Sequence, residues 1–120
     1  MNKAIFLSLL SILLLPLHTF ASERVGDWGP IKDLKDPHVI KIGQFAVNKY
    51  NIQSKSGLKF VNVVRGEFQV VSGVNYRFVV EANDGSNSTY KMYEAVVWEQ
   101  LWMKSMNLTS FTPLLKNRFL

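Results

Sequence analysis

Side chains that could act as nucleophiles, bases or metal ligands are few in this 120-residue chain. It contains no cysteine, which excludes a thiol nucleophile and thiolate metal ligands, and its two histidines are His18 and His38. Glu94 and Glu99 lie five residues apart in a segment with strand periodicity, so they point to opposite faces and cannot pair as acid and base. We interpret both glutamates as solvated charges and His38 as a surface or partly hydrogen-bonded histidine. We therefore predict a protein that is not an enzyme, with no catalytic residues, no metal site and no cofactor.

Two predicted turns depart from the polar composition usual for turns in water. No residue from Phe68 to Tyr76 is charged, and the span 100–103 reads Gln-Leu-Trp-Met, without glycine, asparagine or proline. One interpretation makes the first a plain glycine hairpin turn and folds Trp102 back over the core. The other makes both turns an interaction surface with Trp102 as its anchor.

The segment 36–54 has the apolar period of an amphipathic helix. Asp36 suits the N-cap position, Pro37 suits the first helical position, and Gly57 is predicted to end the helix in a left-handed conformation. The apolar face of this helix is formed by Val39, Ile42, Phe45, Ala46 and Tyr50.

After Leu58 the period changes to two, which is typical of strands. We predict strands near 58–71, 74–83, 89–99 and 106–112, and a short edge strand before the helix. A sheet with one apolar face and one amphipathic helix predicts an α+β fold, a single long helix packed across a four- to five-stranded antiparallel β-sheet. Successive turns of such a meander alternate between its two ends, so the turns at Ser72 and Trp102 should lie side by side.

The N-terminus has the pattern of a secretory signal peptide, with Lys3, an apolar run over 4–17 and small residues before the expected cleavage near Ala21 or Ser22. We predict that residues 1–21 are the signal peptide and that the protein is secreted, to the extracellular space or an endomembrane or vacuolar compartment, without a membrane anchor. Residues 22–35 are expected to form a flexible arm and the edge strand, 36–114 the folded domain, and 115–120 a frayed tail.

The charge of the chain and two short motifs bear on its partners and its modification. The net charge of +5 is spread along the chain and not gathered into a basic block, so we expect no nucleic-acid partner. Asn87 and Asn107 each begin an Asn-x-Ser/Thr sequence and are candidates for N-glycosylation.

Three segments of the chain resemble the plant cystatins, which inhibit cysteine proteases. Residues 42–51 (Ile-Gly-Gln-Phe-Ala-Val-Asn-Lys-Tyr-Asn) resemble the helix signature of that family. Residues 69–73 match its Gln-x-Val-x-Gly first binding loop, and 93–99, followed by Trp102, resemble its second hairpin. The resemblance covers essentially the whole chain that remains after signal removal.

The resemblance implies a cystatin domain that reversibly and competitively inhibits papain-like cysteine proteases, in plant defence or in control of the plant's own enzymes. It implies a tripartite wedge that fills the active-site cleft. The wedge residues are Val25 and Gly26 of the arm, Gln69, Val70, Val71, Ser72 and Gly73 of the first loop, and Leu101 and Trp102 of the second loop.

Two positions depart from the family pattern, which usually has Gly-Gly-Trp in the arm and Pro-Trp in the second loop. This chain has Asp27 after Gly26 and Leu101 before Trp102, so we expect weaker or shifted affinity. The alternative function is a cystatin-fold protein with weak or lost inhibition that serves as a binding or storage module. We expect a monomer, with a domain-swapped dimer as the open alternative.

Overall fold

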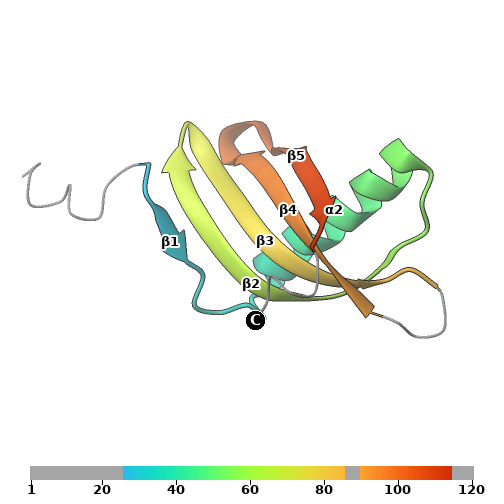
Figure 1. Cartoon of the computed structure of the whole chain (residues 1–120). Coiled ribbons are helices and arrows are strands. Elements are labelled where there is room, and N and C mark those ends of the chain that lie inside the picture. Colours follow the sequence, from blue (N-terminus) through green and yellow to red (C-terminus); the bar gives the residue numbers. More distant parts are fainter. Residues whose placement is uncertain (1–25, 86–89, 115–120) are drawn as a thin grey trace, which may run out of the picture.

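The computed structural model describes residues 26–85 and 90–114 as one helix laid across one antiparallel sheet (Figure 1). The five strands are hydrogen-bonded in chain order. The elements are β1 (Trp28–Pro30), α2 (Pro37–Ser54), β2 (Lys59–Val71), β3 (Gly73–Asn83), β4 (Tyr90–Gln100) and β5 (Ser105–Pro113). The predicted α+β architecture is confirmed.

Helix α2 begins as its sequence predicts but ends differently. The Asp36 carboxylate accepts a hydrogen bond from the backbone N–H of His38 at 2.8 Å, and Pro37 occupies the first turn. The prediction that Gly57 ends the helix is wrong, because Lys55 takes the left-handed conformation, with φ of 55°, and its N–H bonds the Asn51 carbonyl. A lysine can hold this strained backbone because that bond satisfies one of the last helical carbonyls.

The core lies between α2 and the inner face of the sheet. Alternate residues of β3 are buried, as the period of two predicted. At the far end of the helix Tyr50 stacks on Phe111, with ring centroids 4.3 Å apart. The buried apolar residues are Val39, Ile42, Ala46, Val47, Val63, Phe78, Val80, Ala82, Tyr93, Ala95 and Val97.

Gly43 lets the helix approach the sheet closely. A Cβ atom at this position would lie 2.7 Å from Cε1 of Phe60 and 2.9 Å from Cγ2 of Val63, both closer than van der Waals contact allows. The glycine inside α2 is therefore required by packing against β2 and not by the helix itself.

The turns between β2 and β3 and between β4 and β5 lie at the same end of the sheet (Figure 1). The register pairs Val74 with Glu99 across β3 and β4, which places Ser72 close to the end of β4. At the opposite end, Asn83 of β3 pairs with Tyr90 of β4. No helix within the described residues combines the length and apolar character needed to cross a membrane.

Candidate functional site

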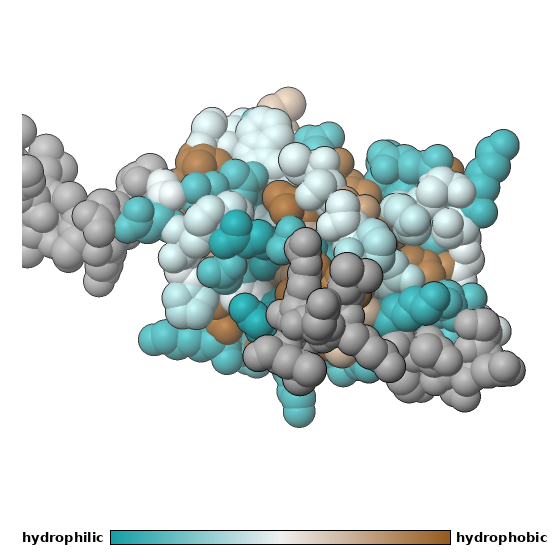
Figure 2. Space-filling view, in the orientation of Figure 1, coloured by the Kyte–Doolittle hydropathy of each residue, from teal (hydrophilic) through white to brown (hydrophobic). Residues whose placement is uncertain are grey.

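Large apolar side chains are exposed on both turns at this end of the sheet. The exposed fractions are 61% for Leu101, 63% for Trp102 and 62% for Met103. We call the group formed by Val70, Val71, Leu101, Trp102 and Met103 the apolar edge. In Figure 2, hydrophobic residues reach the surface at the upper left, where the β2–β3 turn lies in Figure 1. The interpretation that Trp102 folds back over the core is wrong.

The first turn depends on Gly73, as predicted from its position. Its φ is +97°, and a Cβ there would lie 2.5 Å from the backbone oxygen of Glu99 on the neighbouring strand. The indole N–H of Trp98 also donates to the carbonyl of Ser72 at 2.8 Å. The second hairpin therefore contacts and supports the first turn.

The second turn is a short 3₁₀ segment, Leu101–Met103, between β4 and β5. Lys104 closes it in the left-handed conformation, with φ of 48°, and its N–H donates to the Leu101 carbonyl at 3.1 Å. This geometry replaces the turn-forming residue that the sequence lacks. Met103 was not among the predicted site residues, although its place beside Trp102 in an uncharged turn was the signal that could have identified it.

Glu99 is buried near the end of β4, and its interpretation as a solvated charge is wrong. It is 4% exposed, and its Oε1 lies 2.8 Å from Nε2 of His38. The pKa of Tyr76 is raised to about 12. Burial is the largest cause, followed by the charge of Glu99, a hydrogen bond to Glu99 and the charge of Asp36. This cluster ties the start of α2 to the end of β4. Glu94 lies on the opposite face, as predicted.

The arm meets the first turn at Gly26, whose φ is +100°. The Gly26 N–H donates to the Val70 carbonyl at 3.1 Å, and its carbonyl accepts from Nε2 of Gln69 at 2.6 Å. The structure thus brings Gly26, residues 69–73 and residues 101–102 to one end of the sheet. Val25 lies outside the described residues.

The two glycosylation candidates are placed differently. Asn87 lies outside the described residues. Asn107 is exposed on β5, opposite Trp98 of β4.

A groove of about 1000 Å³ opens between β1 and the start of α2. Its lining includes Trp28, Phe68, Val70 and Tyr76, so the groove adjoins the apolar edge at Val70. Across the described residues, no three or more histidine, aspartate or glutamate side chains are grouped so as to hold a metal ion.

Comparisons with known proteins point to protease inhibitors. A family model described as "Aspartic acid proteinase inhibitor" matches residues 31–114. The chain is 55% identical over 121 residues to "Cysteine proteinase inhibitor 5" of Arabidopsis thaliana, which covers 99% of this chain and 98% of that protein. It is 49% identical to "Cysteine proteinase inhibitor 8" of Oryza sativa subsp. japonica, over 74% of this chain and 72% of that protein.

Solved structures agree in fold. A salivary cystatin from the soft tick Ornithodoros moubata superposes with a TM-score of 0.65 at 20% identity, over 75% of this chain and 98% of that one. Dimeric human cystatin F superposes with a TM-score of 0.61 at 19% identity, over 74% of this chain and 86% of that one. At these identities the likeness establishes the fold alone.

Proposed function

Since this chain belongs to the plant cysteine proteinase inhibitors of the cystatin superfamily, which are not enzymes, we propose that it is a reversible competitive inhibitor of papain-like cysteine proteases. The apolar edge and the arm at Gly26 enter the active-site cleft of the protease together. Inhibition then follows from occupancy, because the wedge covers the catalytic thiolate without offering it a bond to cleave.

The observation that carries the proposal is the exposure of the apolar edge on turns that are held in place. An indole of this kind buries about 150–250 Å² when it enters an apolar cleft. At about 25 cal/mol per Å² this is roughly 4–6 kcal/mol before the entropy lost on association is subtracted. Trp102, with 63% of its surface exposed, is therefore the main anchor.

Pre-organisation of the two turns supports the same function. Gly73 and Lys104 hold backbone conformations that close their turns, and the Trp98–Ser72 bond joins one hairpin to the other. Little conformational freedom remains to be lost on binding, so more of the burial energy appears as affinity.

The test is titration of papain with the purified protein, its Trp102→Ala variant and an Ile52→Ala control. Ile52 is 74% exposed but lies on α2, so its removal tests loss of an exposed apolar side chain away from the edge. We expect Trp102→Ala to raise the inhibition constant at least about 30-fold and Ile52→Ala to leave it unchanged. Competition with substrate and recovery of papain activity on dilution check the mode of inhibition.

Other outcomes would replace this proposal. The matching family model is described as an "Aspartic acid proteinase inhibitor". A pepsin-like enzyme, which is an aspartic protease, is therefore titrated in parallel. Inhibition of that enzyme alone would contradict the proposed target class. Absence of inhibition of either enzyme at micromolar concentration would favour the alternative, a binding or storage module, for which the groove beside β1 is the surface to examine.

We also propose that the protein is secreted and that it carries a glycan on Asn87 or on Asn107, the second of which is exposed on β5. Expression in plant cells followed by N-terminal sequencing and glycosidase digestion tests both points. Retention of Met1 in the purified protein would contradict secretion by cleavage, and an unchanged mobility after digestion would contradict glycosylation.

A further inference from the structure

The described part of the arm makes few backbone contacts of its own with the sheet. Strand β1 has three residues, and the last of them, Pro30, has no N–H to donate. Backbone bonds flank it on each side, from Gly26 to Val70 and from Ile31 to Gly66. A strand this short needs side chains to hold it in place.

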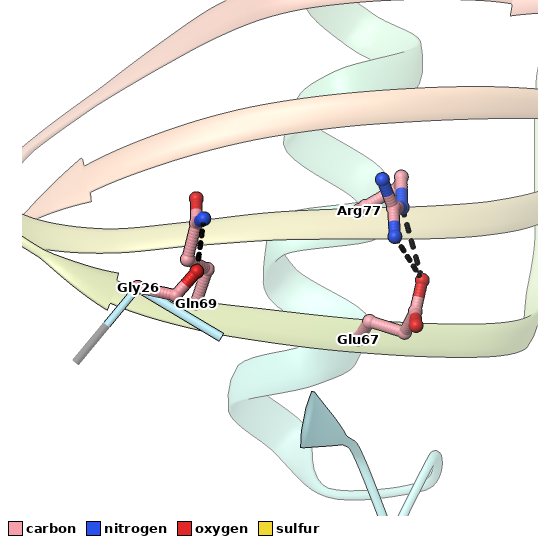
Figure 3. A network of polar contacts seen from close by, with 4 residues as sticks. All are labelled: Gly26, Glu67, Gln69 and Arg77. Carbon is pink, nitrogen blue, oxygen red and sulfur yellow. Dashed lines mark hydrogen bonds and ion pairs between the residues drawn. The ribbon is translucent and has the colours of Figure 1, made fainter. Parts of the chain in front are cut away.

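Two side-chain contacts on the outer face of the sheet supply that support. Figure 3 shows the Gln69–Gly26 bond of the second contact and the Arg77–Glu67 pair that holds the guanidinium of the first. The guanidinium of Arg77 lies 4.1 Å from the ring centroid of Trp28 and is itself fixed by bonds of 2.9 and 2.7 Å to Glu67. The amide of Gln69 donates to the Gly26 carbonyl at 2.6 Å. The arm is thus held at Trp28 and again at Gly26.

Asn75 determines which way the Gln69 amide points. Its Nδ2 donates to Oε1 of Gln69 at 3.0 Å, so the Gln69 oxygen faces Asn75 and the nitrogen faces Gly26. With both ends of the amide engaged inside the protein, Gln69 has a partner for each polar group before any protease binds.

We propose that Gln69, oriented by Asn75, is a positioning residue that fixes the arm at Gly26 against the base of the first turn, so that arm and turn meet the protease as one surface. This inference rests on the proposed function for its consequence, but the clamp itself can be measured in the free protein. It assigns Gln69 to the support of the wedge and not to contact with the protease.

Gln69→Glu is the decisive variant, because it keeps the shape and the oxygen that accepts from Asn75 but replaces the donor to Gly26 with a second acceptor. In the free protein we expect the amide hydrogen of Gly26 to exchange about tenfold faster, while that of buried Ala46 in α2 is unchanged. Asn75→Ala, which leaves Gln69 intact but unoriented, should accelerate the same exchange by a smaller factor. Gln53→Glu on the exposed surface of α2 is the matched control for charge and shape. Unchanged exchange at Gly26 in Gln69→Glu would overturn the clamp.

A double-variant cycle against papain tests the consequence. Gly26→Ala places no atom in contact with the protein but disfavours the φ of +100°, so it releases the arm by a different route. We expect Gln69→Glu and Gly26→Ala each to raise the inhibition constant about five- to tenfold. The inhibition constant of the double variant should be no higher than that of the single variant that inhibits more weakly. Multiplying effects would overturn the positioning role.

These outcomes separate the two proposals. If the parent protein does not inhibit papain, the proposed function fails, and the exchange of the Gly26 amide still decides whether Gln69 holds the arm. If the parent inhibits papain but the Gly26 amide exchanges at the same rate in Gln69→Glu as in the parent, the inference fails and the proposed function stands.

Discussion

The Glu99 carboxylate occupies an environment that few charged side chains tolerate. It lies near the end of β4 with 4% of its surface exposed and is bonded to His38. Removing a charge from water is unfavourable unless partners replace the lost hydration, and His38 and Tyr76 supply that replacement. The cluster therefore joins the end of β4, which leads into the second turn, to the start of α2.

Tyr76 should make the stability of the protein depend on alkaline pH. Its pKa is about 12 in the folded protein, against about 10 when unfolded, so folding favours the protonated phenol. The contribution of this pKa shift to the free energy of unfolding is fully present below pH 10 and is lost as the pH rises toward 12. After allowance for solvent screening of this half-buried group, we expect a loss of about 1–2 kcal/mol in the free energy of unfolding.

Urea unfolding at pH 9 and pH 11.5 measures this loss in the parent and in Tyr76→Phe. The variant lacks the titrating hydroxyl, whereas the other tyrosines are present in both proteins. The parent should lose about 1–2 kcal/mol more than the variant over this interval. Equal losses would show that Tyr76 is not the group responsible.

Helix α2 shows how packing between elements can outweigh local propensity. Alanine is favoured over glycine inside a helix by about 1 kcal/mol. At Gly43, however, the added methyl group would lie 2.7 Å from the ring of Phe60 and 2.9 Å from Val63. Overpacking a buried site lowers the free energy of unfolding by about 1–3 kcal/mol. The cost of forcing α2 and β2 apart therefore exceeds the gain in helix propensity.

We expect Gly43→Ala to lower the free energy of unfolding by about 1–2 kcal/mol. Equilibrium denaturation in urea measures the change. Gln44→Ala, at the exposed neighbouring position, should stay within about 0.5 kcal/mol of the parent. A stabilised Gly43→Ala protein would mean that the helix can move away from the sheet without loss.

The whole domain depends on one core for its stability. The sequence has no cysteine, so no disulfide restricts the unfolded chain. Ile42 is fully buried between α2 and the sheet. Domains of this size are stable by about 5–15 kcal/mol, so one large cavity removes a substantial fraction of the total.

Ile42→Ala should therefore lower the free energy of unfolding by about 2–5 kcal/mol and the melting temperature by at least about 10 °C. Calorimetry measures both, with Ile52→Ala as the exposed control. At a temperature where the variant is fully folded, it should inhibit papain as well as the parent does, because Ile42 is a core residue and is not part of the apolar edge. A weakened inhibition by fully folded Ile42→Ala would show that the core controls the shape of the edge.

The sequence by itself determined the order and type of the elements and the position of the two uncharged turns. Apolar periods of 3.6 and 2 are local properties, so the helix over 36–54 and the strands followed from them. The alternation of turns in a meander then placed Ser72 and Trp102 at one end. Asp36 as the N-cap was also readable, because capping involves residues adjacent in the chain.

Only the tertiary structure decided which distant residues meet. Glu99 and His38 are 61 positions apart, and Gln69 and Gly26 are 43 apart, so neither contact leaves a periodic signal in the sequence. Local patterns report the preferences of neighbouring residues, whereas these contacts exist because folding brings separate strands and the helix within hydrogen-bonding distance.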